Sequence, residues 1–166
     1  MAALAAALVA LTMLSGCAQL RARASGSSAN APMLASANPT METQFVASIN
    51  ALRAAHHLRA LRVHPVLVNK ARHWSWWMAA GICGRAANRV PVICHSSLAG
   101  GITVRWSRLT ENVGQATPKS GLAGLPNAFA HSAAHLANIL DASATYVGIG
   151  FAYSGNTGFV TEEFMG

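Results

Sequence analysis

Acidic side chains are scarce in this chain of 166 residues. It holds five aspartates and glutamates against twelve lysines and arginines, which gives a formal net charge of +7 at pH 7. A basic surface attracts anionic lipid headgroups, cell-wall polymers or nucleic acid. The sequence has no zinc-finger spacing, no helix-turn-helix pattern and no basic-aromatic strand motif, so nucleic acid is not expected as a partner. A solvated, arginine-rich surface is expected instead.

A long hydrophobic run is also missing. The apolar start, residues 1–16, is shorter than the roughly 20 residues that a membrane-spanning helix needs. Its length and small-residue end are typical of a signal peptide. The sequence Leu-Ser-Gly-Cys at 14–17 resembles a bacterial lipobox, in which Cys17 is lipidated and begins the mature protein. We therefore expect an exported protein, either held by this anchor at the outer face of the cell membrane or extracellular.

The lipobox reading has an alternative, because no lysine or arginine precedes the apolar run. A plain secretory signal would leave Cys17 incidental. Residues 17–40 contain no periodic apolar face and are rich in Ala, Ser, Asn and Pro, which predicts a flexible tether. The folded domain is expected over residues 41–166, a length that suits one domain. The sequence does not indicate an oligomeric state.

Cysteine is rare, with three residues in the chain. If Cys17 is lipidated, Cys83 and Cys94 remain as an even pair, which in an exported protein predicts a disulfide. A bond that closes a loop of this length stabilises a fold by about 3 kcal/mol in the chain-entropy model. A metal site on this pair is not favoured, because no second cysteine pair accompanies it.

Helical patterns fill the first half of the domain. Asn38 and Pro39 predict a helix start, with asparagine as the cap and proline at the first position. A second helix is expected after Pro65, ended by Gly81, and a third near Pro126. The apolar positions at helical spacing are Phe45, Ile49 and Leu52 in the first helix and Leu67, Ala71, Trp74 and Met78 in the second.

Strand patterns follow later in the chain. Ile102, Val104 and Trp106 alternate with polar residues, which predicts a strand within residues 100–112. Apolar residues alternate again over 147–151, and the turn sequence SGNTG before FVTEEF predicts a terminal hairpin. Helices packed on a late antiparallel sheet predict an α+β fold.

Six short motifs occur in order between residues 45 and 165. They are Asn50-x-x-Arg53, His95-Ser96, Glu111-Asn112-Val113, Ser132-x-x-His135-x-x-Asn138-Ile139-Leu140, Val147-Gly148-Ile149-Gly150 and Phe164. Their order and spacing resemble the CAP superfamily of cysteine-rich secretory, antigen 5 and pathogenesis-related 1 proteins (the SCP domain). The resemblance implies a three-layer α-β-α sandwich with a central antiparallel sheet. It also implies a cleft lined by His95, Glu111 and His135.

The same resemblance bears on two histidines four residues apart. His131 and His135 have the spacing of a helical metal site, but Ser132 is expected to cap a short helix that begins after it. The two imidazoles would then not share a helical face. Ser132, Asn112 and His131 are accordingly expected to support the cleft rather than to line it.

The chain departs from the family pattern at three places. Ala133-Ala134 replaces a Pro-Gly pair, and His57 replaces a glycine before Leu58, where a positive φ would be strained. Residues 113–134 contain no acidic residue, so the second cleft glutamate of many relatives is missing. A set of two histidines and two glutamates becomes two histidines and one glutamate.

Two histidines and one carboxylate form an established zinc set, so His95, Glu111 and His135 are candidate ligands for Zn²⁺ or another divalent cation. Binding to neutral imidazole would weaken below about pH 6.5. The alternative is that the three side chains are polar groups that line a crevice and satisfy one another. The disulfide would hold the backbone next to His95 in either case.

Two classes of function remain. A binding module for a lipid, cell-envelope or protein ligand is favoured, with apolar groove residues Trp74, Trp76, Trp77, Trp106 and Phe129. The alternative is a metal-dependent, protease-like hydrolase that uses the same cleft, with Ser96, Ser97 or Ser132 near a histidine. No Gly-x-Ser-x-Gly elbow or His-Glu-x-x-His helix supports that alternative, and catalysis is not the expected function.

Overall fold

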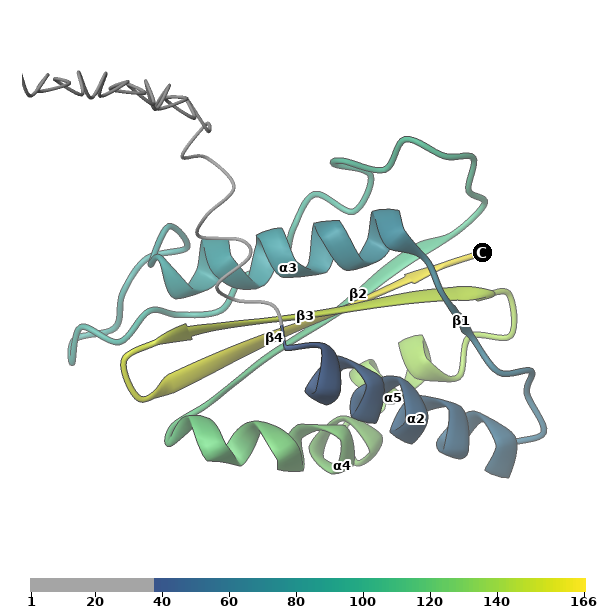
Figure 1. Ribbon diagram of the computed structural model, residues 1–166, viewed down its shortest axis with the longest axis horizontal. Helices are drawn as coiled ribbons and strands as arrows, with labels where there is room; N and C mark the ends of the chain where they lie inside the picture. Colours follow the sequence, from purple (N-terminus) through teal and green to yellow (C-terminus); the bar gives the residue numbers. More distant parts are fainter. Residues whose placement is uncertain (1–37) are drawn as a thin grey trace, which may run out of the picture.

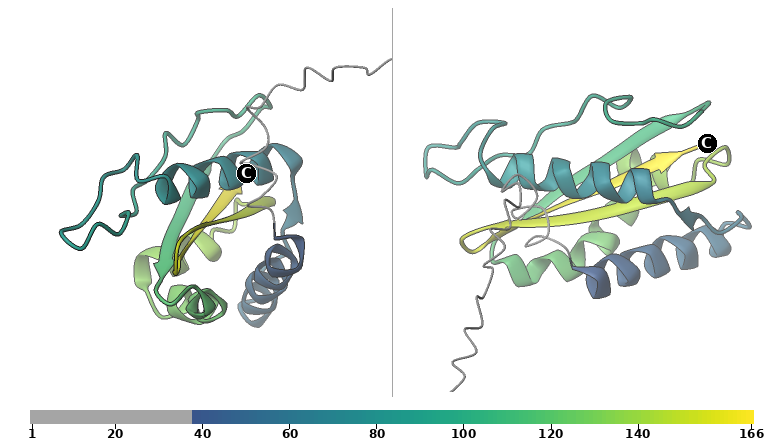
Figure 2. Two further views of the ribbon diagram at one scale, coloured as in Figure 1. Left: turned by 60° about the vertical axis from the view of Figure 1, so that its left-hand side comes forward. Right: turned by 45° about the horizontal axis from the view of Figure 1, so that its top comes forward.

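The computed structural model describes residues 38–166, so the predicted signal peptide, Cys17 and most of the predicted tether lie outside the described residues. In chain order the elements are α2 (Pro39–Ala55), β1 (Arg62–Val63), α3 (Pro65–Ala79), β2 (Leu109–Ala116), the 3-10 helix η1 (Lys119–Gly124), α4 (Leu125–Ala130), α5 (Ala133–Ile139), β3 (Tyr146–Ser154) and β4 (Thr157–Met165). Helix α3 covers one face of the sheet, and α2, α4 and α5 cover the other (Figures 1 and 2). The predicted α-β-α sandwich is confirmed. None of these helices combines the length and apolar character needed to cross a bilayer.

The sheet has four strands in the order β1-β3-β4-β2. Strands β3 and β4 form the predicted terminal hairpin, and β2 pairs antiparallel with β4. The two-residue strand β1 runs parallel to β3, so the sheet is antiparallel except at this edge. The pairing of β2 with β4 places Glu111 opposite Glu163 and Asn112 opposite Glu162. Because neighbouring residues of a strand face opposite sides, each face receives one carboxylate from β4.

Helix α2 begins where the sequence predicts. The Asn38 side chain accepts a hydrogen bond from the backbone N–H of Met41 at 3.1 Å, and Pro39 occupies the first turn. The helix therefore starts two residues before the predicted domain boundary at 41. Phe45 and Ile49 are buried on its inner face, and the Phe45 ring packs edge-on against Phe151 of β3 with 4.9 Å between centroids.

Two motif residues of α2, Asn50 and Arg53, bind the backbone of neighbouring segments. Arg53 is 1% exposed and donates to the carbonyls of Arg59, Ile139 and Asp141 at 2.7 to 2.9 Å. Asn50 bonds both the backbone N–H and the carbonyl of Leu61. These contacts tie the end of α2 to the entrance of β1 and to the connection between α5 and β3, so the two residues have structural roles.

The glycines of the Val-Gly-Ile-Gly motif allow α3 to lie directly on β3. A Cβ atom at Gly148 would come within 2.2 Å of the Leu67 carbonyl carbon, and one at Gly150 within 2.2 Å of the Arg72 nitrogen. Side chains at these positions would push the helix away from the sheet. The close approach brings Lys70, which lies between those two contacts on α3, onto the face that carries Glu111 and Glu163.

The prediction of a strand within residues 100–112 is wrong for residues 100–108. Regular pairing begins only at Leu109, and the segment before it loops above α3 (Figure 1). Val104 and Trp106 are 37% and 47% exposed. Alternation alone does not make a strand, because the backbone also needs a neighbouring strand to pair with. The available edge of β4 is taken by residues 109–116.

Candidate functional site

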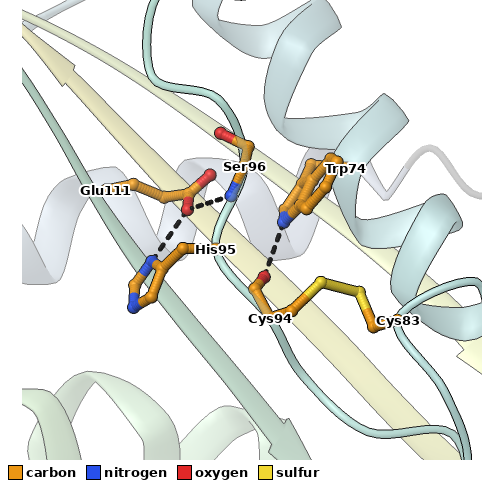
Figure 3. The surroundings of a disulfide bond; sticks show 6 residues. All are labelled: Trp74, Cys83, Cys94, His95, Ser96 and Glu111. Carbon is orange, nitrogen blue, oxygen red and sulfur yellow. Dashed lines mark hydrogen bonds and ion pairs between the residues drawn. A yellow bond between two sulfur atoms is a disulfide. The ribbon is translucent and has the colours of Figure 1, made fainter.

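The predicted disulfide between Cys83 and Cys94 is present, and it fixes the chain next to the candidate cleft (Figure 3). The indole Nε1 of Trp74 on α3 donates to the Cys94 carbonyl at 2.7 Å. Cys94 is thus held by a covalent bond and by a hydrogen bond to a helix. His95 and Ser96 follow directly, so their backbone starts from a fixed point.

The carboxylate of Glu111, on β2, binds this segment by two hydrogen bonds. Its Oε1 accepts from the backbone N–H of Ser96 at 2.9 Å and from His95 Nδ1 at 2.9 Å (Figure 3). Burial alone would raise the pKa of Glu111, but the hydrogen bonds from Ser96, Glu163 and His95 outweigh it, and the pKa lies below its ordinary value. The carboxylate is therefore ionised at neutral pH, so His95 Nδ1 is the donor. Nε2 of His95, whose side chain is 65% exposed, remains available to a ligand.

A second carboxylate is present after all, although it comes from a different part of the chain. Glu163 of β4 lies opposite Glu111 and is fully buried. Lys70 Nζ donates to Glu163 Oε1, donates to Ser96 Oγ at 2.5 Å and lies 3.8 Å from Glu111 Oε2. Burial raises the pKa of Glu163 to about 8; Lys70 opposes the rise and the Glu111 charge adds to it. The two acids thus share one ammonium group, and at neutral pH Glu163 is largely protonated.

Sequence reasoning missed Lys70 and Glu163, yet both leave a signal. Lys70 lies three residues after Leu67 and four before Trp74, on the face of the helix that carries the apolar repeat. Glu162 and Glu163 are adjacent in a predicted strand, so their side chains point to opposite faces. In a sheet covered on both sides, each of these acids must be buried and needs a partner.

His135 of α5 lies at the same end of β2 but faces different neighbours. Its ring stacks on Phe129 with 4.5 Å between centroids, and its Nδ1 is 2.8 Å from Ser132 Oγ. Burial lowers the pKa of His135; a backbone hydrogen bond with Val113 opposes this and the nearby His95 adds to it. Ser132 occupies the N-cap position of α5, but its hydroxyl bonds His135 and makes no cap hydrogen bond. That part of the capping prediction is wrong.

The two histidines four residues apart do not share a helical face, as predicted. Helix α4 ends at Ala130 and α5 begins at Ala133, with a bend between them. His131 is exposed, and its Nδ1 lies 2.8 Å from the Asn127 carbonyl, one turn back along α4. His131 therefore stabilises the end of its own helix and makes no contact with His95 or Glu111.

Asn112 links β2 to α5 on the opposite face of the sheet. Its Nδ2 donates to Glu162 Oε2 at 2.9 Å and to the His135 carbonyl at 3.2 Å, and its Oδ1 accepts from Asn138 at 2.8 Å. Asn138 also donates to the Glu111 carbonyl. These bonds fix α5 against the strand that carries Glu111. Burial raises the pKa of Glu162 to about 7, although the bond from Asn112 lowers it.

The three candidate zinc ligands do not form a ligand set in this geometry. Among residues 38–166 no group of three or more His, Cys, Asp or Glu side chains lies close enough to hold a metal ion. Glu111 Oε1 already accepts two hydrogen bonds, and the cation nearest its other oxygen is the Lys70 ammonium. The residues present thus do not fit a zinc centre. His95 is bound to Glu111, whereas His135 is bound to Ser132.

Two cavities meet at Ser96. The His95 cavity, of about 360 Å³, is lined by His95, Ser96, Leu98, Thr110, Glu111 and Asn138. The α3 cavity, of about 420 Å³, has Val66, Lys70, Trp74, Ser96, Ser97 and Gly101 among its lining residues. His135 lines neither of these two cavities. The structure thus brings His95 and Glu111 together in one cavity and leaves His135 beside it.

Comparison with known proteins agrees with the architecture. A family model described as the cysteine-rich secretory protein family (CAP) matches residues 46–164. No curated protein matches the sequence.

Three solved structures share the fold. A cysteine-rich secretory protein from Staphylococcus aureus has 15% identity and a TM-score of 0.58, over 77% of this chain and 38% of that one. An extracellular protein containing an SCP domain from Bacillus anthracis has 22% identity and a TM-score of 0.56, over 75% of this chain and 39% of that one. An outer surface protein from Borrelia burgdorferi has 15% identity and a TM-score of 0.58, over 78% of this chain and 96% of that one. The chain spans about two fifths of the first two proteins, and at these identities the likeness concerns the fold.

Proposed function

Because the chain belongs to the cysteine-rich secretory protein (CAP) family, we propose that it is an exported binding module, anchored by a lipid at Cys17. Its ligand is a hydroxyl-bearing molecule of the cell envelope, which enters the His95 cavity. Two of the similar structures are an extracellular protein and an outer surface protein, which supports export. The proposal assigns no reaction to the His95 cavity.

Unpaired polar atoms in the His95 cavity carry the proposal. Thr110 Oγ1 is buried and has no hydrogen-bond partner in the described part of the chain, whereas Glu111 Oε2 lies beside Lys70 Nζ, at 3.8 Å, and the Glu163 carboxyl group. A buried polar atom without a partner costs about 1 to 3 kcal/mol. His95 Nε2 adds a second polar atom at the more exposed side. A hydroxyl group both donates and accepts, so a ligand with several hydroxyl groups would satisfy the threonine and the imidazole together.

The charge distribution supports an anionic envelope ligand. Glu42 and Asp141 are paired with Arg72 and Arg108, and the other three acids are buried. The exposed side chains that carry unpaired charge are therefore cationic; they include Arg59, Arg89, Arg105 and Lys119. Such a surface raises the local concentration of polyanions. A phosphate-bearing polyol, from a lipid headgroup or a wall polymer, has both the charge and the hydroxyl groups.

The test compares His95→Ala with His131→Ala, each in the full chain with Cys17→Ser, so that the proposed lipid anchor does not itself insert into the vesicles. Both variants remove an imidazole, but only the first takes it from the cavity. Binding is measured to phosphatidylglycerol vesicles, to phosphatidylcholine vesicles and to purified cell-wall polymer. We expect His95→Ala to weaken binding about tenfold or more, equivalent to at least about 1.4 kcal/mol, and His131→Ala to leave it unchanged. Equal affinity of the two variants, or no binding to any material, would overturn the proposal.

The two anionic materials separate the possible sources of the ligand. Binding to phosphatidylglycerol but not to the wall polymer would identify a lipid headgroup, and the reverse would identify a polymer. The anchor is tested separately by mass spectrometry of the mature N-terminus. A diacylglyceryl mass on Cys17 is expected, and an unmodified Cys17 or cleavage elsewhere would refute it.

A further inference from the structure

Ser96 is part of a hydrogen-bonded chain that the envelope-binding proposal does not use. Its Oγ accepts from Lys70 Nζ at 2.5 Å, and the same Nζ donates to Glu163 Oε1. The hydroxyl, the ammonium and the carboxylate come from three separate elements: the segment after the disulfide, α3 and β4. Lys70 is 9% exposed and Glu163 is fully buried, so the chain runs from the interior to the hydroxyl.

The hydroxyl lies at the open end of this chain. Ser96 is half-buried and lines both the His95 cavity and the α3 cavity. Its backbone N–H is bound to Glu111, and Cys94, two residues earlier, is bound to Cys83, so the backbone of Ser96 is held at the wall of the cavities (Figure 3). Ser96 Oγ thus lies in a cavity wall beside Lys70, and Lys70 also contacts the Glu163 carboxyl group. A lysine that gives a proton to that carboxylate becomes a base for the serine hydroxyl.

We propose that Ser96 is a nucleophile that attacks carboxylic esters whose apolar acyl group occupies the α3 cavity, while Lys70 and Glu163 carry the hydroxyl proton away. This activity is separate from ligand binding in the His95 cavity and does not require His95.

The step balances with the groups present. With Glu163 ionised, Lys70 first passes one of its protons to the Glu163 carboxylate. The free amine of Lys70 then takes the hydroxyl proton as Ser96 Oγ bonds the ester carbonyl carbon. Lys70 is then again an ammonium group and stabilises the negative charge that develops on the attacked carbonyl group. The carbon–oxygen bond of the ester breaks, and the leaving alcohol receives the proton back from Glu163 through Lys70. Water then attacks the acyl-serine by the same route, which releases the acid and restores Ser96.

The α3 cavity favours an apolar acyl group. Val66 and Trp74 line the cavity with apolar surface, and Gly100 and Gly101 line it without side chains of their own; Asn69, His73 and Ser97 also border it. The Trp74 ring is held in place by its bond to the Cys94 carbonyl and by stacking on Trp77 at 5.8 Å. At about 420 Å³ the cavity suits a short acyl chain rather than a peptide. Lys70 and Ser96 supply the polar end.

An alkyl fluorophosphonate tests the proposal without knowledge of the natural ester. The reagent bonds Ser96 Oγ through phosphorus, the phosphorus–fluorine bond breaks, fluoride leaves and the proton goes to Glu163. The full chain is treated at about pH 9, where Glu163, with its pKa of about 8, is mostly ionised. Intact mass and peptide mapping are expected to show one label, on Ser96. Ser96→Ala should take up none, and Ser107→Ala, an exposed serine of the same segment, should label like the parent.

Variants of the relay distinguish a chemical role from a structural one. Glu163→Gln keeps the shape and the hydrogen bond but cannot accept the proton, so labelling should slow about tenfold or more. Lys70→Arg keeps the positive charge, but a guanidinium does not release a proton in a protein, so labelling should be lost as in Lys70→Met, with folding of each checked by circular dichroism. Hydrolysis of p-nitrophenyl butyrate should follow the same order. Absence of label on Ser96 in the folded parent, or equal labelling of parent and Glu163→Gln, would overturn the proposal, and neither outcome bears on the His95→Ala binding test.

Discussion

His57 is held in a backbone conformation that suits glycine. Its φ is +58°, in the left-handed region, where it ends α2 and lets the Leu58 N–H bond the Arg53 carbonyl at 2.9 Å. A residue with a Cβ atom loses roughly 1 to 2 kcal/mol in this region. The strain foreseen from the missing glycine is therefore present in the structure.

We predict that His57→Gly stabilises the protein by up to about 1 kcal/mol, because relief of the left-handed strain exceeds the extra entropy of glycine in the unfolded chain. Urea unfolding at constant pH measures the change. His56→Gly is the matched control, since His56 has φ −101° and gains nothing from glycine. A lower unfolding midpoint for His57→Gly than for the parent would contradict the argument.

The second residue-scale prediction concerns zinc. The Lys70 ammonium lies 3.8 Å from Glu111 Oε2 and is bound to Glu163, so a cation already neutralises the Glu111 carboxylate. We expect the melting temperature in excess zinc to equal that in chelator. A rise with zinc that disappears in both His95→Ala and His135→Ala would show that the three side chains rearrange into a ligand set.

At the scale of single residues, the sequence motifs predicted part of the cleft correctly. His95, Ser96 and Glu111 belong to family motifs, and from these the sequence predicted that His95 and Glu111 share a cleft. The structure shows both His95 and Ser96 hydrogen-bonded to Glu111. Lys70 and Glu163 belong to no motif, and their contact depends on how α3 lies on the sheet and which residue of β4 is opposite Glu111. Such a register is set by tertiary packing, and no short stretch of sequence specifies it.

At the scale of elements, β4 is the most informative. It carries two adjacent acids, with Glu162 toward α2 and α4 and Glu163 toward α3. Burial raises their pKa values to about 7 and about 8. In the unfolded chain a glutamate ionises near pH 4.3, so folding takes up protons above that pH. The contribution to stability is complete below the unfolded pKa and is lost as pH rises through the folded values.

We therefore predict that the free energy of unfolding falls by several kcal/mol between about pH 6 and pH 9, since each unit of pKa shift corresponds to about 1.4 kcal/mol. The lowered pKa of His135 acts in the opposite direction, but only below its usual value near 6.5. Urea unfolding at pH 6, 7.5 and 9 measures the trend. Glu163→Gln should flatten the upper part of the curve, and a stability that is constant or rises with pH would refute the assignment.

The segment between α3 and β2 is the second element that decides the site. The Cys83–Cys94 bond closes a loop with a sequence separation of 11 directly before His95. We predict that Cys83→Ser with Cys94→Ser lowers the free energy of unfolding by about 3 kcal/mol, because the unfolded chain regains loop entropy. Thermal unfolding with and without reductant measures it. The parent should lose stability in reductant and the double variant should not, and equal melting temperatures for parent and variant would contradict the prediction.

Elements were predictable where a local signal sufficed. Helices α2 and α3 start at an asparagine or histidine followed by proline, and the β3–β4 hairpin has alternation together with a glycine turn. The segment around Val104 and Trp106 alternates equally well, yet it has no strand to pair with. Strand β1 has two residues and is defined only by its pairing with β3. In both cases the deciding fact lies far away along the chain.

At the scale of the whole molecule, the basic surface follows from the interior. All five acids of the chain are buried or paired with arginine within the described residues, and three of them lie in the central sheet. Few acids are left to oppose the exposed arginines. The scarcity of acidic residues in the sequence thus appears in the structure as a surface with charge of one sign.

We predict that this surface, and not the His95 cavity, makes envelope binding sensitive to salt. Affinity for phosphatidylglycerol vesicles should fall by about tenfold or more between about 0.05 M and 0.5 M sodium chloride, because the Debye length shortens from about 14 Å to about 4 Å. Co-sedimentation of the full chain with Cys17→Ser, which lacks the proposed anchor, measures it. His95→Ala should bind more weakly at every salt concentration but with the same salt dependence, whereas Arg89→Gln with Arg105→Gln should bind less steeply. An affinity that does not change with salt would show that the cationic surface takes no part in binding.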